Sequence, residues 1–362
     1  MEEVYIVESL RTPFGSFGGE LSDVEAPRLA AAVIRGLLDH SGLPAEAVDE
    51  VIVGQVLAGG AGQAPARQAM RYAGLPDSIP ALTINKVCGS GLKALMLGAD
   101  AIRLGDVDVV IAGGMENMSL TPYLLNKGRY GYRMGNGELL DLMILDGLQD
   151  PYSGKHMGVI AEATTEKHGL TREQQDAFAL RSYQRAQAAV NDGIFREEII
   201  PVVKQGRKGE VTVSQDEEPF KVDVAKLTGL RSAFKKEGTI TAGNASTIND
   251  GAALTLLASA AAVEEYGLKP KARVVAYAAN SRHPDQFAEA PVGAIEKVCA
   301  KAGLQFSDID LFEINEAFAS VPLVVARELG IDLGRVNVNG GAVAIGHPIG
   351  ASGARLVATL IR

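Results

Sequence analysis

The feature that most constrains this chain is an internal repeat, in which matching segments lie 261 or 262 residues apart. Residues 42–53 share a pattern with residues 303–314: a glycine, a short polar stretch and a β-rich run. Residues 89–95 and 351–357 also match, and each of these segments opens a helical pattern. Such a repeat predicts two similar βαβ-type halves related by a pseudo-twofold axis. We therefore expect an α/β protein whose two glycine-lined turns face each other across one site.

A more polar segment, residues 119–247, separates the two halves. Long loops are expected at 126–137 and 204–218, and the capping-box pair Thr171 and Gln174 predicts the start of a long helix. The predicted domains are an N-terminal half (1–118 and 248–268), an inserted loop domain (119–247) and a C-terminal half (269–362).

The second half is expected to be incomplete. The first half continues beyond its helix into the run 107–117, whereas Arg362 corresponds to a position still inside the matching helix. A sheet that lacks a terminal strand keeps an unpaired edge. We therefore interpret the second half as truncated.

Composition excludes several classes of function. The chain has 362 residues, of which 47% are hydrophobic and 22% charged, and this fits a compact α/β protein. A net charge of −9 argues against a nucleic-acid surface, and the longest apolar run, residues 252–263, is too short to span a bilayer. The histidines show no paired metal-ligand spacing, so no metal is expected. Two cysteines and an acidic start without a signal-peptide pattern predict a cytoplasmic location.

Cys88 is the first candidate catalytic residue, because it lies where an apolar run ends and a helical pattern begins. Unpaired N–H groups and the macrodipole at a helix N-terminus favour a thiolate over a thiol. Gly89 and Gly91 permit a tight turn and a close approach of backbone or ligand. A buried structural cysteine is the commoner alternative, and the glycines alone leave the two interpretations nearly even.

The second glycine-lined turn carries His347, three residues before the repeat counterpart of Cys88. Its restricted backbone suits a positioned base or oxyanion donor. Asn315 follows the predicted strand 311–314, and an amide there could hold a water or a carbonyl. A purely structural role, in which Asn315 forms a turn and caps a helix, is an equally good interpretation of the sequence. The sequence contains no dinucleotide-binding Gly-x-Gly-x-x-Gly motif, P-loop or Gly-x-Ser-x-Gly elbow.

Four motifs follow one another along the chain. They are Asn-Lys-Val-Cys-Gly-Ser-Gly at 85–91, Gly-Gly-Met-Glu-Asn-Met-Ser at 113–119, Asn-Glu-Ala-Phe-Ala at 315–319 and Gly-His-Pro-Ile-Gly at 346–350. In this order they resemble the motifs of the thiolase family, and the resemblance extends over the whole chain. It implies the thiolase fold, with two pseudo-symmetric halves in a layered α/β/α/β/α core and an inserted loop domain. It also implies a coenzyme A-dependent acyltransferase of lipid metabolism that uses ping-pong covalent catalysis.

The resemblance implies roles for individual residues. Cys88 would be the acylated nucleophile, His347 would activate it and donate to the thioester oxygen, and Asn315 would hold a water in the same oxyanion hole. The residues that match the coenzyme A pantetheine tunnel, or lie beside it, are His156, Met157, Ser246, Ala317 and Phe318. The inserted domain would carry the coenzyme A site, and residues 120–137 resemble the loop that joins dimers into tetramers. A homodimer or homotetramer is expected. No cofactor is expected, because coenzyme A thioesters are the substrates.

The second half departs from the family pattern. Thiolases carry a last motif, Cys-x-Gly-Gly-Gly, whose cysteine moves the proton at the substrate α-carbon and whose glycine backbone completes an oxyanion hole. This sequence does not contain the motif, and Cys299 cannot replace its cysteine because it lies in a helical stretch. Two hypotheses remain open: a thiolase that condenses acetyl-CoA or thiolyses 3-ketoacyl-CoA, and a truncated chain that only binds acyl-CoA or is acylated by it. A plain cysteine hydrolase ranks last, because it explains neither the second turn nor the inserted domain.

Overall fold

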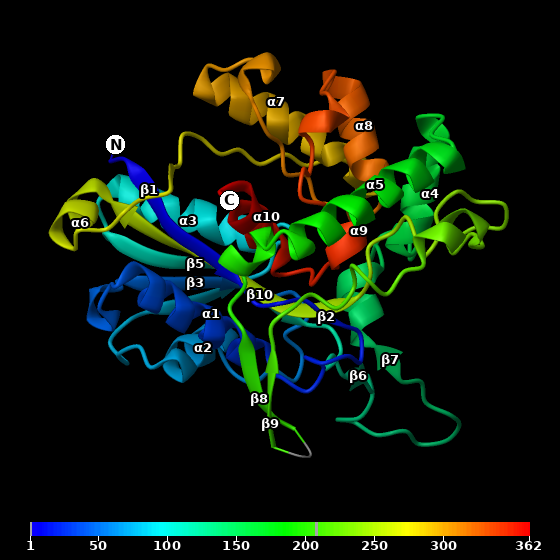
Figure 1. Cartoon of the computed structure of the whole chain (residues 1–362). Coiled ribbons are helices and arrows are strands. Elements are labelled where there is room, and N and C mark those ends of the chain that lie inside the picture. The colour runs from blue at the N-terminus through cyan, green and yellow to red at the C-terminus, as the bar shows by residue number, and fades with distance from the viewer. Residues whose placement is uncertain (1, 207–208) are drawn as a thin grey trace.

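The computed structural model describes residues 2–206 and 209–362, and its first half is built on one seven-stranded sheet (Figure 1). The strands are β1 (Val4–Arg11), β2 (Gly15–Ser16), β3 (Glu50–Gly54), β4 (Ala81–Ile84), β5 (Val109–Asn117), β10 (Asn249–Ser259) and β11 (Ala272–Arg273). Strand β10 is antiparallel to β1 and β5, while β3 runs parallel to both β5 and β4. Every residue of β5 and β10 is buried, as the continuous apolar and small-residue runs of these strands require.

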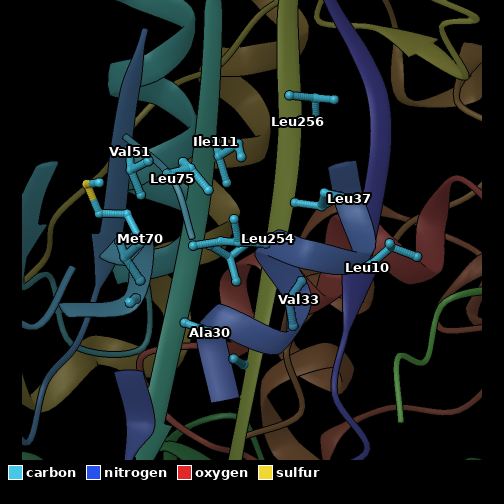
Figure 2. Close-up of a cluster of buried hydrophobic side chains, with 14 of the residues drawn as sticks. Leu10, Ala30, Val33, Leu37, Val51, Met70, Leu75, Ile111, Leu254 and Leu256 are labelled. Atoms are coloured by element: carbon cyan, nitrogen blue, oxygen red, sulfur yellow. The ribbon is translucent and has the colours of Figure 1, made fainter. Parts of the chain in front are cut away.

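Helices cover both faces of this sheet. Helices α1 (Ala26–Ser41) and α2 (Pro65–Ala73) pack on one face, where their side chains join those of the strands in one buried cluster (Figure 2). Helices α3 (Ser90–Leu104) and α10 (Ser352–Leu360) pack on the other face. Helix α3 ends before Gly105, a C-cap residue with a φ of 75°, which is the left-handed conformation that glycine adopts readily.

The helices that follow the two glycine-lined turns contact each other as the repeat predicts. A Cβ added to Gly91 would lie 2.9 Å from the backbone nitrogen of Ala354, and one added to Gly353 would lie 2.6 Å from that of Leu92. Since the repeat places Gly353 at the position of Gly91 and Ala354 at that of Leu92, the two contacts are equivalent. The turns are therefore related by a local pseudo-twofold axis, and their close approach requires glycine at both positions.

The second half has helices but no sheet of its own within the described ranges. Helices α7 (Ala290–Ala302) and α8 (Ser320–Leu329) lie beyond α3 and α10 from the sheet, and α9 (Ala342–Ile345) precedes the His347 turn (Figure 1). The strand expected at 311–314 does not form: within these residues Phe312 makes an isolated parallel bridge with Val336. The repeat counterpart of residues 311–314 is β3, which pairs with β4 on one side and β5 on the other. The described residues contain no counterpart of β5 beside residues 311–314. The fourth layer of the expected core is therefore extended chain rather than a hydrogen-bonded sheet.

The inserted segment contains two hairpins and two long helices. Its elements are β6 (Tyr123–Leu124), β7 (Leu140–Asp141), α4 (Met157–Lys167), α5 (Arg172–Asn191), β8 (Val202–Gly206) and β9 (Gly209–Val213), and α6 (Ala260–Glu265) follows β10. The capping box predicted for Thr171 and Gln174 is present at the start of α5. The loop expected at 204–218 is present only in part. Strands β8 and β9 pair over 202–206 and 209–213, where their valines favour extended structure, whereas 214–218 form no helix or strand and 207–208 lie outside the described residues. In the part of the chain that is described, no helix combines the length and apolar character needed to cross a membrane.

Candidate active site

Cys88 lies in a short turn between β4, which ends at Ile84, and α3, which begins at Ser90. The Ser90 hydroxyl closes the turn: it donates to the Val87 carbonyl oxygen at 2.6 Å and accepts from the Lys86 N–H at 2.8 Å. Val87 has a φ of 48°, a left-handed conformation that β-branched residues rarely adopt. Strain of this kind costs about 1–3 kcal/mol and concentrates at functional sites. The strained residue is thus Val87, and not one of the glycines to which the sequence pointed.

The Cys88 side chain packs against an apolar group contributed by both halves: Val56, Leu57, Met118 and Ile349. Burial raises the pKa of the Cys88 thiol to about 11, and the negative charge of Glu116 adds to this rise. This direction is opposite to that expected of a thiol at a helix N-terminus, because desolvation outweighs the backbone hydrogen bond that favours the thiolate. Cys88 rests as a thiol and needs a base to ionise it.

His347 is buried in the turn between α9 and α10. Its backbone N–H donates to Asn249 Oδ1 at 2.9 Å, and this bond fixes the turn to the start of β10. Its Nδ1 lies 2.6 Å from the Ser352 hydroxyl oxygen, which lies 2.9 Å from the Pro348 carbonyl oxygen. A carbonyl cannot donate, so Ser352 gives its proton to Pro348 and accepts the Nδ1–H of His347. This hydrogen-bond pattern assigns the tautomer in which Nε2 is unprotonated and available as a base.

The Cys88 and His347 side chains meet at the junction of the two halves. The distance from Cys88 Sγ to His347 Nε2 is 3.2 Å. Burial and the positive charge of Arg355 lower the pKa of His347 to about 3, so the imidazole is neutral. A neutral imidazole beside a thiol can accept the proton as the sulfur attacks. The structure thus brings together the two residues that the repeat placed on facing turns.

Asn315 joins this pair. Its Nδ2 lies 3.3 Å from His347 Nε2, and its Oδ1 is buried with no hydrogen-bond partner among the described residues. A buried unpaired amide oxygen is costly, so a water or a substrate group that donates to it would be stabilised. The side chain contacts His347 rather than its own turn, and this argues against the purely turn-forming alternative. The preceding residue, Ile314, is held by Asn337, which bonds both its N–H and its carbonyl oxygen at 2.8 Å.

The residues matched to a coenzyme A tunnel lie in one neighbourhood: His156, Met157, Ser246, Ala317 and Phe318. His156 forms the N-cap of α4 and stacks on Phe234, with the ring centroids 5.0 Å apart. Phe234 also meets Phe318 edge-on, at a centroid distance of 6.0 Å, and Ser246 Oγ donates to the Ala317 carbonyl oxygen at 2.9 Å. Ala317 is two residues after Asn315, the residue that contacts His347.

Several residues of the site received no role from the sequence: Glu116, Asn249, Ser352 and Phe234. Ser352 is the repeat counterpart of Ser90, so its bracing of the second turn could have been anticipated from the first. Glu116 lies within a motif, but the motif does not reveal that its carboxylate accepts three backbone N–H groups. Asn249 and Phe234 carry no local signal, because their partners lie far away along the chain.

Known proteins show the same organisation. The chain matches the sequence profile of the thiolase N-terminal domain over residues 4–261 and that of the thiolase C-terminal domain over residues 268–362. An acetyl-CoA acetyltransferase of Pseudomonas aeruginosa is 54% identical over 100% of this chain and 92% of its own, and one of Chromobacterium violaceum is 53% identical over 99% and 92%. The crystal structure of the Bacillus anthracis acetyl-CoA acetyltransferase superposes with a TM-score of 0.97 at 42% identity, covering 100% of this chain and 92% of that one. Sequence, fold and the order of the site motifs agree, and the chain belongs to the thiolase family.

Proposed function

We propose that the protein is an acyl-CoA acyltransferase that works through an acyl-enzyme on Cys88. The observation that carries the proposal is the 3.2 Å contact between Cys88 Sγ and the unprotonated Nε2 of His347. The relatives named acetyl-CoA acetyltransferase, at 54% and 53% identity, support acetyl-CoA as the acyl donor.

In the first half-reaction Cys88 Sγ attacks the thioester carbonyl carbon while its proton moves to His347 Nε2. A bond forms between Cys88 and the acyl carbon, the bond to the coenzyme A sulfur breaks, and His347 returns the proton to the departing thiolate. Ser352 keeps the opposite nitrogen protonated and oriented throughout. Once protonated, His347 Nε2 can donate a hydrogen bond to the thioester oxygen, which gains negative charge during the attack. Asn315 Nδ2, 3.3 Å from His347 Nε2, is a second donor for the same oxygen.

The neighbourhood of Phe234 supports binding of the coenzyme A part of the substrate. Its apolar and aromatic side chains suit the pantetheine arm. An open pocket of about 530 Å³ beside Phe234 has four basic residues and one acidic residue in its lining: Arg172, Arg231, Lys235, Lys236 and Glu237. Arg172 and Lys235 pair with Asp176 and Glu166, so Arg231 and Lys236 are the first candidates to contact a phosphate. This local basic surface would let a chain of net charge −9 bind an anionic substrate.

The second half-reaction requires a proton to leave the α-carbon of another acetyl-CoA. The resulting enolate attacks the acyl group on Cys88 and gives a 3-ketoacyl-CoA, and thiolysis is the reverse. Within the described residues no second thiol lies beside Cys88, since Cys299 is in α7. A second candidate function is acylation at Cys88 without formation of a carbon–carbon bond.

Incubation with acetyl-CoA followed by peptide mass spectrometry tests the proposal. We expect an acetyl adduct on the peptide that contains Cys88, absent from Cys88→Ala and retained in the matched control Cys299→Ala. A thiolysis assay with a 3-ketoacyl-CoA and free coenzyme A then separates the two candidates. Turnover supports a thiolase reaction, whereas an adduct without turnover supports acylation alone. The absence of an adduct would contradict both.

Self-association into a homodimer or homotetramer is part of the proposal. Residues 120–137 expose large apolar side chains, among them Tyr130 and Met134, which are 91% and 97% accessible. Exposed apolar groups gathered in one segment are typical of an interface. Sedimentation velocity should show an oligomer that dissociates in part when Tyr130 and Met134 are both changed to glutamate. A wild-type monomer would contradict this part of the proposal.

A further inference from the structure

The carboxylate of Glu116 joins backbone of the two halves beside the Cys88–His347 pair. Glu116 lies near the end of β5 and is fully buried. Its Oε2 accepts from the N–H groups of Val56 and Gly350, both at 3.0 Å, and its Oε1 accepts from the Leu57 N–H at 3.1 Å. Val56 and Leu57 follow β3 in the first half, whereas Gly350 belongs to the His347 turn of the second half. One side chain therefore holds both halves.

The backbone around Gly350 is packed without spare room. A Cβ added to Gly350 would lie 2.6 Å from the Met115 carbonyl oxygen and 2.8 Å from Glu116 Oε2. A Cβ added to Gly114 would overlap the carbonyl oxygen of Gly350. Glycine backbone in van der Waals contact has little orientational preference, whereas charge-assisted N–H···O bonds are directional. The bonds to Glu116 are therefore the part of this contact that can set the orientation of the His347 turn.

The same carboxylate acts on Cys88. Val56 and Leu57, whose N–H groups it holds, are part of the apolar wall against which Cys88 packs. A negative charge near a thiol opposes its ionisation, and Glu116 contributes in this way to the raised pKa of Cys88. The other charged group that acts on Glu116 is Asp250, which accepts from the Ser119 N–H at 3.0 Å and from its hydroxyl at 2.6 Å. Burial raises the pKa of Glu116 to about 7, so its full charge is present at alkaline pH.

We propose that Glu116 is a positioning residue for acyl transfer: it holds the His347 turn against the wall of the Cys88 pocket and places a negative charge beside that wall. The catalytic consequence rests on the proposed function. The effect on Cys88 ionisation does not, because it can be measured without an acyl donor.

The ionisation of Cys88 can be measured from its rate of alkylation by iodoacetamide, followed on the peptide that contains Cys88 at a series of alkaline pH values. The midpoint is the pH at which this rate is half of its maximum. In Glu116→Gln, which keeps the shape and loses the charge, we expect the pH midpoint of Cys88 alkylation to move down. The rate of acetylation by acetyl-CoA should fall at least about tenfold, because a glutamine amide cannot accept all three N–H bonds. The matched control is Glu162→Gln, since Glu162 is another buried carboxylate that accepts backbone N–H groups, from Thr239 at 3.0 Å and Ile240 at 2.8 Å. In this control variant the alkylation midpoint of Cys88 should equal that of the wild type.

A second variant separates charge from position. Glu116→Asp keeps the charge on a shorter side chain, so the alkylation midpoint should stay high while the acetylation rate falls. An unchanged midpoint in Glu116→Gln would overturn the proposal. Failure of both Glu116 variants to fold, while Glu162→Gln folds, would also overturn it, because Glu116 would then be purely structural. A shifted midpoint in a protein that forms no acetyl adduct would support the charge effect and contradict the proposed function.

Discussion

The two turns that form the site are held in place by different means. The turn with Cys88 follows β4 of a seven-stranded sheet and is braced by its own Ser90. The turn with His347 follows no strand of a sheet within the described ranges, and two side chains of the first half, Asn249 and Glu116, hold its backbone. The comparison indicates that the candidate base, His347, depends for its position on the half that contains the candidate nucleophile, Cys88.

The two turns nevertheless share one local device. In each, a serine at the start of the following helix donates to a carbonyl oxygen of the turn: Ser90 to Val87 at 2.6 Å, and Ser352 to Pro348 at 2.9 Å. In the first turn the serine accepts a backbone N–H, and in the second it accepts the Nδ1–H of His347. The same bond geometry thus braces a loop in one half and assigns a tautomer in the other.

Removal of the base should have the largest effect. In His347→Gln we expect the rate of Cys88 acetylation to fall by roughly 10²–10⁴, because a thiol with a raised pKa loses its proton acceptor. Quenched-flow sampling with peptide mass spectrometry measures this rate. His283→Gln is the control, since His283 is exposed, and its rate should match the wild type. A His347→Gln rate close to the wild type would mean that the second turn does not supply the base.

Disruption of the contact between the halves should come next. Gly114→Ala places a methyl group on the carbonyl oxygen of Gly350, and neither backbone can move away without disturbing β5 or the His347 turn. We expect the free energy of unfolding to fall by about 3 kcal/mol, measured by urea denaturation. Gly229→Ala is the matched control, because a Cβ there meets no atom within 4 Å, and its stability should stay within about 0.5 kcal/mol of the wild type. Equal stabilities for the two variants would break the picture of a tight contact.

The buried neutral imidazole should make stability depend on pH. The pKa of His347 is about 3 in the folded protein, below its ordinary value of about 6.5, so the unfolded chain binds more protons between these values. Stability is therefore fully present above about pH 6.5 and is lost as the pH falls toward 3. Between about pH 7 and pH 4 the loss due to His347 is roughly 3 kcal/mol. Urea denaturation of His347→Gln should show a loss smaller by this amount, and identical losses would contradict a neutral His347.

The serine brace should have the smallest effect of the four. Ser352→Ala removes the acceptor of the His347 Nδ1–H, and we expect the acetylation rate to fall about tenfold because the imidazole tautomer and orientation are less well held. Ser320→Ala is the control: its hydroxyl is buried and has no hydrogen-bond partner in the described part of the chain. A Ser352→Ala rate equal to that of Ser320→Ala would show that His347 is held well enough by the bonds that its turn's backbone N–H groups donate to Asn249 and Glu116.

Local patterns predicted the parts of this protein that depend on neighbouring residues. The capping box of α5 is present as predicted. The repeat predicted that two turns face each other, and the reciprocal contacts of Gly91 and Gly353 confirm it. The same reasoning was wrong for the strand at 311–314, because a strand forms only where neighbouring strands pair with it. It was also wrong for residues 204–206 and 209–213 of the expected loop, where β8 and β9 pair.

The sequence by itself determined the family, the position of Cys88 at a strand-to-helix turn and the presence of His347 and Asn315 on facing segments. Only the tertiary structure decided that Cys88 rests as a thiol, that His347 is neutral with an unprotonated Nε2, and that Glu116 holds both halves. The reason is that ionisation depends on desolvation and on charges brought from distant parts of the chain. Local sequence contains the residues, whereas their ionisation depends on which surfaces the fold brings together.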